Sequence, residues 1–310
     1  MLRTLRPEQL RNVQIVPLTG YDSDGSLALD VMRENTCRLA EAGMKVFIPC
    51  AGSSEFHSLC ADEMAAAVSM TREAVSDEAV VMAPVGLQLG YAIDVGHRSL
   101  DAGADCLLVM PLTAPYLSDT GARDYYHALL DELACPLVIY KKSEIPSDDL
   151  LLELADHPKV MGVKYAVNDL DAFNRIVDDD EGRIEWFCGS AERFAPFMML
   201  AGATGYTSGA GNLCPHLTLA MFEACSLGDW PQAMRLQQII RPIENYRARA
   251  GSSYNISFLK YAAKSIGLDF GPPRPPQRRL TVHEQREIDE LLAPILEAEA
   301  ELAQTPAGVR

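Results

Sequence analysis

The chain has 310 residues and carries 27 basic against 43 acidic side chains, for a net charge of −16. This length suffices for either two ordinary domains or one barrel-sized domain. The negative charge disfavours nucleic-acid backbones and anionic membranes as partners, but a small anionic substrate needs only a few local donors.

Cysteine usage and the N-terminal residues bear on the compartment. The eight cysteines show no CxxC spacing, and several fall inside apolar runs, as is usual in a reduced cytoplasm. The opening residues MLRTLRPEQLRN contain no apolar segment of signal-peptide length, and no run of about twenty apolar residues follows. We therefore expect an untargeted, soluble, cytoplasmic protein.

Short apolar runs recur along the chain, each followed by a longer segment with helical spacing. The predicted strands are 13–18, 45–50, 79–86, 106–111, 136–142, 160–166, 184–190 and 205–210. Nearly continuous apolar strands that alternate with helices predict a parallel sheet covered by helices. Eight such units within roughly 200 residues favour a (β/α)8 barrel over a doubly wound sheet.

The remainder of the chain is predicted to be helical. Helical patterns run near 230–249, 254–266 and 282–303, and the stretch GPPRPP at 271–276 separates the last two. We therefore divide the chain into a barrel over 1–228 and a helical C-terminal extension over 229–310. The glycines of GATGYTSGAG at 202–211 do not fit the GxGxxG spacing, so they give little support to a dinucleotide site.

The stretch VMGVKYAVNDL, residues 160–170, places Lys164 at the end of an apolar strand. An unpaired ammonium group is costly to remove from water and tends to lose its proton instead, which makes the amine a nucleophile. The local stretch by itself favours the alternative, a strand whose lysine simply ends it in solvent.

Several other polar residues are predicted at the carboxyl-terminal rim of the barrel, where the active sites of such barrels lie. Tyr140 ends the fifth strand, and Lys142 lies two residues further on, on the same side of that strand. Gly52, Ser53 and Ser54 follow the second strand, and backbone N–H groups at such a turn can hold a carboxylate. At the end of the eighth strand, Thr207 and Ser208 are further candidates for substrate binding.

These residue types together suggest one chemistry. An uncharged lysine amine adds to a ketone to give an imine, which allows a neighbouring C–H or C–C bond to break. Only about one lysine amine in a few thousand is neutral at pH 7, so the pocket must lower its pKa by desolvation or by a nearby positive charge such as that of Lys142. The hydroxyl of Tyr140 could then relay protons.

The ordered set VPLTGYDSDGSL, AGSSEFHSL, AGADCLLVMP, VIYKKSEIP, GVKYAVNDL, GATGYTSGAGNLCP and GPPRPP resembles the family of dihydrodipicolinate synthase and N-acetylneuraminate lyase. The resemblance implies a (β/α)8 barrel with a helical extension, no cofactor, and a homo-oligomer, either a dimer or a tetramer. It also implies Lys164 as the Schiff-base lysine, Tyr140 as the proton relay and GSSE as the carboxylate-binding turn. Within this family, SSEFHSL and RARAGSSYNISFLKYAAKSIG look most like 5-dehydro-4-deoxyglucarate dehydratase.

The sequence also departs from the family pattern. Ser53 and Ser54 stand where many members have two threonines, and Thr113 replaces a tyrosine that in the synthase reaches the neighbouring subunit, although Tyr116 is close by. The segment KKSEIP lacks the arginine that marks the synthase, which argues against dihydrodipicolinate synthesis.

The leading hypothesis is an imine-forming dehydratase that acts on an acyclic 2-oxo acid. The alternatives are an aldolase or synthase that uses the same imine, and a sensor or scaffold that has lost turnover. The six histidines show no HxH or HExxH spacing, so we predict no metal site.

Overall fold

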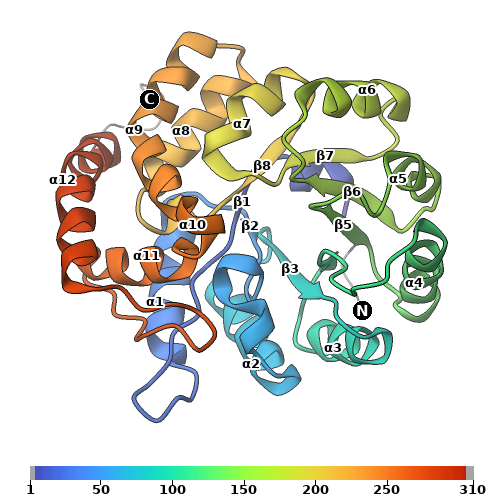
Figure 1. Cartoon of the computed structure of the whole chain (residues 1–310), viewed down its shortest axis with the longest axis horizontal. Coiled ribbons are helices and arrows are strands. Elements are labelled where there is room, and N and C mark those ends of the chain that lie inside the picture. The colour runs from blue at the N-terminus through green and yellow to red at the C-terminus, as the bar shows by residue number, and fades with distance from the viewer. Residues whose placement is uncertain (1–3, 305–310) are drawn as a thin grey trace.

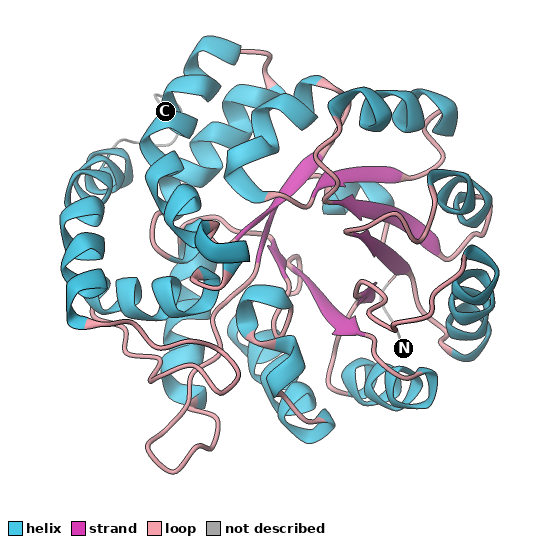
Figure 2. Ribbon diagram, in the orientation of Figure 1, coloured by secondary structure: helices cyan, strands magenta, loops and turns pink. Residues whose placement is uncertain are grey.

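The computed structural model describes residues 4–304. Eight parallel strands close into one barrel in chain order, each hydrogen-bonded to its neighbours in sequence and β1 to β8 (Figures 1 and 2). The strands are β1 Val13–Ile15, β2 Val46–Phe47, β3 Val80–Val85, β4 Cys106–Val109, β5 Leu137–Lys141, β6 Val160–Tyr165, β7 Glu185–Cys188 and β8 Gly205–Ser208. The predicted (β/α)8 barrel is therefore confirmed, with strands somewhat shorter than the apolar runs.

A helix follows each strand and covers the outside of the barrel (Figure 2). The helices are α1 Leu29–Glu41, α2 Ala61–Ala74, α3 Leu89–Asp101, α4 Asp119–Glu132, α5 Asp148–Ala155, α6 Leu170–Asp180, α7 Ala191–Leu200 and α8 Pro215–Ser226. Between β2 and α2 the chain makes two short 3₁₀ turns, Gly52–Ser54 and Phe56–Ser58. This irregular connection places the GSSE segment at the rim of the barrel.

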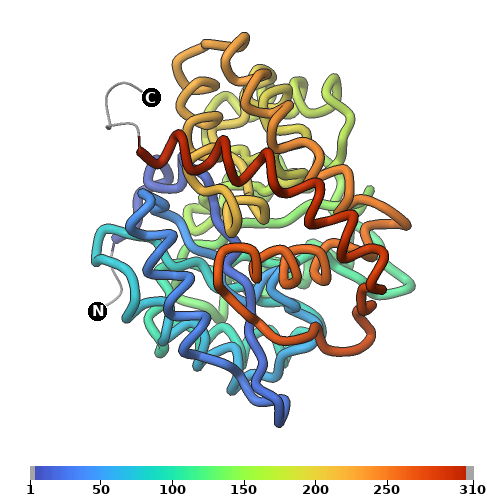
Figure 3. The backbone as a smooth tube through the Cα atoms, turned by 90° about the vertical axis from the view of Figure 1, so that its left-hand side faces the viewer, coloured from blue at the N-terminus to red at the C-terminus, as the bar shows by residue number. Residues whose placement is uncertain are grey.

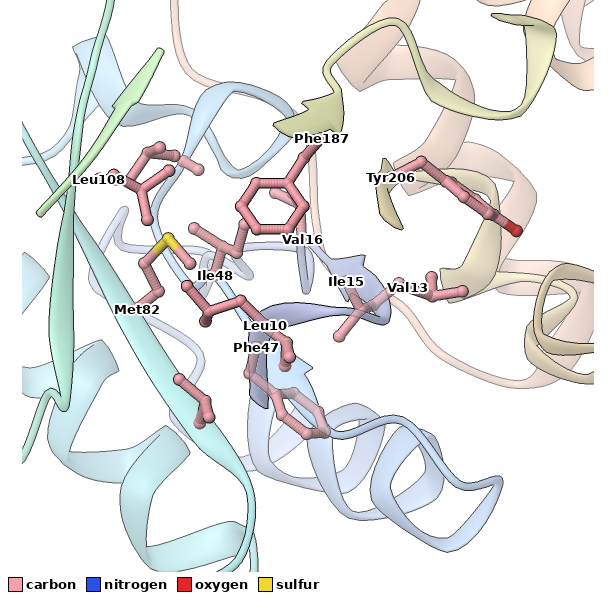
Figure 4. Packing of buried hydrophobic residues seen from close by; sticks show 14 of the residues in the cluster. Leu10, Val13, Ile15, Val16, Phe47, Ile48, Met82, Leu108, Phe187 and Tyr206 are labelled. Atoms are coloured by element: carbon pink, nitrogen blue, oxygen red, sulfur yellow. The ribbon is translucent and has the colours of Figure 1, made fainter. Parts of the chain in front are cut away.

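The inside of the barrel is filled with apolar side chains. Val16, Ile48, Met82, Leu108 and Phe187, which come from or lie just beyond five different strands, converge in Figure 4, and all are at most 5% exposed. Such a filled interior is a packed core and not a channel. Water therefore cannot approach the rim residues from below.

The C-terminal extension consists of α9 Trp230–Arg247, α10 Arg249–Ser252, α11 Asn255–Ala262 and α12 Val282–Gln304. Helix α9 packs on α7 and α8, and the long α12 crosses α8, α9 and α11, as Figure 3 shows in red. The boundary that we propose at 228 lies between α8 and α9. The outer parts of the two proposed domains, residues 1–3 and 305–310, lie outside the described residues.

Within residues 4–304, every helix is too short or too polar to cross a lipid bilayer.

Candidate active site

Lys164 lies near the carboxyl-terminal end of β6 and faces the inside of the barrel. It pairs in register with Tyr140 on β5 and with Phe187 on β7. The Nζ atom of Lys164 lies 4.0 Å from the centre of the Tyr140 ring, and the residue is only 5% exposed. The alternative that this lysine simply ends a strand in solvent is therefore wrong.

Two glycines make room for the lysine. A Cβ atom on Gly162, two residues before Lys164, would lie 2.6 Å from the carbonyl oxygen of Glu185 and 2.7 Å from the ring of Phe187. A Cβ atom on Gly189, just after β7, would lie 3.1 Å from Cγ of Lys164. Without side chains at these two positions, β6 and β7 approach closely and the lysine stem packs between them.

Burial changes the acidity of this amine. Desolvation, with a smaller contribution from the positive charge of Lys142, lowers the pKa of Lys164 from 10.5 to about 7. A large fraction of the amines is then neutral near physiological pH, as imine formation requires. Tyr140 responds in the opposite sense, because burial raises the pKa of its hydroxyl to about 12, so that it keeps its proton.

The two neighbouring lysines of β5 have different surroundings. Lys141 is buried outside the barrel, where its ammonium pairs with Asp148 at 3.3 Å. Lys142 is exposed, and its charge lowers the pKa of Lys164 and contributes to the lowered pKa of His57. The positive charge of Lys142 therefore lies within electrostatic reach of both Lys164 and His57.

The turn after β2 is held by contacts of its serines. The hydroxyl of Ser54 is fully buried and donates a hydrogen bond to the carbonyl oxygen of Pro17, while Thr19 Oγ1 donates to the carbonyl oxygen of Ser54 at 2.7 Å. Ser54 was predicted to bind substrate, but its hydroxyl instead anchors the turn to the segment after β1. Ser53 is half-buried and accepts a hydrogen bond from Arg247 at 3.2 Å.

A buried ion pair supports the same turn from behind. Glu55 adopts a left-handed backbone conformation with φ of 64°, and Lys260 Nζ donates to its carboxylate at 2.9 Å. The backbone N–H of Arg274 donates to the other carboxylate oxygen at 2.8 Å. Both charged side chains of the pair are at most 2% exposed, so each depends on the other to offset the cost of burial.

The two predicted residues of β8 face opposite sides of the barrel wall. Thr207 donates a hydrogen bond to the carbonyl oxygen of Cys188 at 3.3 Å. Ser208 contacts the buried carboxylate of Glu192 and accepts a hydrogen bond from the backbone of Gly211 at 2.8 Å. The Ser208 hydroxyl is thus engaged between the barrel and α7, whereas strand alternation turns Thr207 toward the barrel interior.

Arg247 at the end of α9 was not among the predicted site residues, although it lies at the rim. Its guanidinium pairs with Glu244 and donates to Asn255 Oδ1 at 2.6 and 2.9 Å. A Cβ atom on Gly209 would lie 2.4 Å from Arg247 Nη2, so any larger residue after β8 would displace the guanidinium group from this position. In the sequence, the feature that could have indicated this contact is the stretch RARAGSSYNIS, in which Arg247 and Asn255 are eight positions apart.

The loop after β4 points away from this site. Tyr116 is 96% exposed and Thr113 is also exposed. Neither side chain therefore forms part of the rim cluster of its own chain. Among residues 4–304, no group of three or more His, Cys, Asp or Glu side chains is placed to hold a metal ion.

Comparison with known proteins agrees with this geometry. The model of the dihydrodipicolinate synthetase family matches residues 9–295. The chain belongs to this family. The family resemblance predicted from the motifs is thereby confirmed, and so is the prediction that the chain is an enzyme of the lyase type.

The proteins that are similar to this chain carry different names. A protein of Streptomyces avermitilis named "Probable 5-dehydro-4-deoxyglucarate dehydratase 1" is 31% identical over 287 residues, which cover 89% of this chain and 90% of the relative. The crystal structure of dihydrodipicolinate synthase from Bacillus clausii has a TM-score of 0.89 at 33% identity and covers 93% of this chain and 98% of its own. The crystal structure of dihydrodipicolinate synthase from Oceanobacillus iheyensis has the same TM-score at 29% identity. That match covers 92% of this chain and 96% of the solved chain.

Replacement of Lys164 tests the burial of a deprotonated amine without reference to turnover. Because the pKa is about 7 in the folded chain against 10.5 without burial, folding between these values releases a proton, and stability rises with pH over this range. We expect Lys164→Met to raise Tm by a few degrees at pH 7, on the order of a 1–2 kcal/mol gain for a domain of this size. The gain should shrink steadily toward pH 10.

Differential scanning calorimetry at several pH values measures this difference, with Lys45→Met, at an exposed lysine beside the opposite end of the barrel, as the control. A gain that does not depend on pH would contradict a depressed pKa.

Proposed function

We propose that the chain is an imine-forming hydro-lyase that removes water from an acyclic 2-oxo sugar acid, as in 5-dehydro-4-deoxyglucarate dehydratase. The observation that carries the proposal is the buried amine of Lys164, with a pKa of about 7, packed against Tyr140 at the rim of the barrel. The names of the sequence relatives support the dehydration reaction.

The turn after β2 is the proposed site for the carboxylate next to the ketone. The backbone N–H groups of Gly52 and Ser53 donate to no other group in the part of the chain that the structure describes. Two free amides at a tight turn are suited to a carboxylate. The Ser53 hydroxyl receives a hydrogen bond from Arg247 and donates to Asn255 Oδ1 at a long 3.5 Å, a contact that a bound carboxylate can replace.

The proposed reaction begins at the amine. Neutral Lys164 adds to the ketone, and loss of water from the carbinolamine gives a protonated imine. The imine draws electrons from the adjacent carbon, which loses a proton, and the electron pair then expels the hydroxyl group of the next carbon, which takes up a proton and leaves as water. Hydrolysis of the remaining imine releases the product and frees Lys164. Tyr140, which is protonated at neutral pH, donates and recovers the proton during carbinolamine formation and loss. In the related dehydratase, loss of the distal carboxylate as carbon dioxide accompanies this step.

Lys142 is the proposed partner of the distal carboxylate. It is exposed at the mouth, and its positive charge lies near enough to lower the pKa of Lys164. Arg247 is less available, since its guanidinium is 8% exposed and already paired with Glu244 and Asn255. A protein of net charge −16 needs such a local cation to hold a dianion.

The names of the solved structures favour a second candidate, in which the same imine supports C–C bond formation or cleavage. The segment KKSEIP, which lacks the arginine typical of the synthase, argues against it. Mass spectrometry of products from a panel of 2-oxo sugar acids separates the two: a dehydrated or decarboxylated acid supports the dehydratase, and pyruvate with an aldehyde supports an aldolase. The paired Lys164 and Tyr140 argue against a non-catalytic scaffold.

We also propose that the chain forms a homo-oligomer, a dimer or tetramer, in the cytoplasm. The support is the exposure of large apolar side chains, among them Tyr116 at 96%, Leu227 at 76% and Leu200 at 64%. Such residues are expected at subunit interfaces, where aromatic side chains are enriched.

Trapping of the imine identifies the reactive lysine. Borohydride reduces an imine of pyruvate to a stable secondary amine, and we expect the added mass on one tryptic peptide, the one that contains Lys164. The lysines of the neighbouring strand, Lys141 and Lys142, serve as internal controls. An adduct on either of them, or no adduct, would show that the assignment is wrong.

Removal of the Tyr140 hydroxyl tests the proton relay. We expect Tyr140→Phe to slow turnover by about 10²-fold or more, the range for loss of a positioned proton donor. The ring that packs on Lys164 is retained, so the fold should be unchanged by circular dichroism. Near wild-type turnover would mean that the tyrosine serves packing alone.

Removal of the Lys142 charge tests both of its proposed roles. Lys142→Met should raise KM for a dicarboxylic 2-oxo acid far more than it raises the pyruvate concentration needed for half-maximal trapping by borohydride. The acidic limb of the pH–rate profile should also move to higher pH, because the charge of Lys142 helps to lower the pKa of Lys164. Lys45→Met is the matched control. Equal changes in both quantities, together with an unmoved profile, would indicate Arg247 instead as the partner of the distal carboxylate.

A further inference from the structure

A cleft lies in the C-terminal extension, apart from the mouth of the barrel. It has a volume of about 280 Å³ and is formed by α11, the turn that follows it, the proline-rich segment and the start of α12, all at the left of Figure 1. Its lining residues are Ser257, Lys260, Tyr261, Lys264, Asp269, Gly271, Pro272, Pro273, Arg279, Leu280 and Gln285. None of them belongs to the barrel strands or to the turns of the proposed active site.

The charge of the cleft is positive in a strongly acidic protein. Three cations, Lys260, Lys264 and Arg279, line it together with a single carboxylate, that of Asp269. Lys264 pairs with Asp269 at 3.0 Å, and Lys260 is directed to Glu55 behind the cleft. Arg279 is exposed and forms no ion pair with another described residue. Its guanidinium is therefore available to an anion.

A second observation independently points to a ligand. Ser257 on α11 is only 4% exposed, and its hydroxyl is buried without a hydrogen-bond partner in the described part of the chain. A buried hydroxyl of this kind is destabilising unless something accepts its hydrogen bond. Because Ser257 lines the cleft, an oxygen atom of a bound molecule could provide the missing acceptor.

The remaining walls limit the chemical class of that molecule. Tyr261, Leu280 and the two prolines Pro272 and Pro273 give the cleft an apolar surface beside the cations. A bare inorganic anion would leave this surface uncovered, whereas an organic acid can place its carbon skeleton against it. Small-molecule sites typically combine such apolar walls with a few polar groups that fix orientation.

We propose that this cleft is a binding site for a small organic carboxylate. The carboxylate is held by the positive charges of Arg279 and Lys264 and accepts a hydrogen bond from the Ser257 hydroxyl, and the carbon skeleton packs on Tyr261 and Leu280. Lys260 connects this site to the turn after β2 through its pair with Glu55. The site does not depend on the proposed reaction, and its occupancy can be measured without turnover.

Calorimetric titration of the full chain with glutarate, benzoate and inorganic phosphate tests the proposal. We expect glutarate or benzoate to bind in the cleft with an affinity that Arg279→Ala lowers by about tenfold or more, as for loss of a charged hydrogen bond. Arg241→Ala, at an exposed arginine on α9, is the matched control and should leave this binding unchanged.

The variants also identify which anion site is observed. Lys142→Met, at the mouth of the barrel, should leave binding in the cleft unchanged, whereas the conservative Ser257→Ala should weaken it. Phosphate binding as tight as that of both organic acids would overturn the organic class. Binding that is equal in the wild type and Arg279→Ala, or no binding by either organic acid, would overturn the site itself.

Discussion

The removal of water from one amine is the constraint on which the proposed site depends. The (β/α)8 barrel achieves it by geometry, because Lys164 lies inside the wall of strands and above a filled apolar core. Phe187, which belongs to the core drawn in Figure 4, pairs in register with Lys164, and Gly162 leaves the space that the Phe187 ring occupies. A charged ammonium group would be costly in this position, so the fold itself selects the neutral, reactive form.

A second set of contacts shapes the rim from outside the barrel. Lys260 on α11 pairs with Glu55, and Arg247 on α9 contacts Ser53, so that two side chains of the C-terminal extension hold the turn after β2. Each pair joins residues about 200 positions apart in sequence. The extension is therefore a structural part of the proposed carboxylate site, because loss of Lys260 would leave the Glu55 carboxylate buried without its ion-pair partner.

Strand alternation explains how two adjacent lysines can have different roles. Lys141 lies outside the wall with Asp148, and the exposed Lys142 is close enough for its charge to act on Lys164. The inward residues Tyr140 and Lys164 are opposite each other in register, which brings an aromatic ring against the amine. On β8, strand alternation likewise places Ser208 outside the barrel wall, where it contacts Glu192, and Thr207 on the inner side.

The sequence by itself determined the barrel, its eight strands in order, and the position of Lys164 and Tyr140 at strand ends, because apolar periodicity and strand alternation are local properties. The sequence also indicated the family to which the chain belongs, because the motifs of that family follow one another along the chain. Only the tertiary structure decided that Ser54 is an internal anchor, that Ser208 contacts Glu192, and that Arg247 reaches the rim. These outcomes depend on which distant side chain meets each hydroxyl, and such long-range contacts leave no periodic pattern in a single sequence.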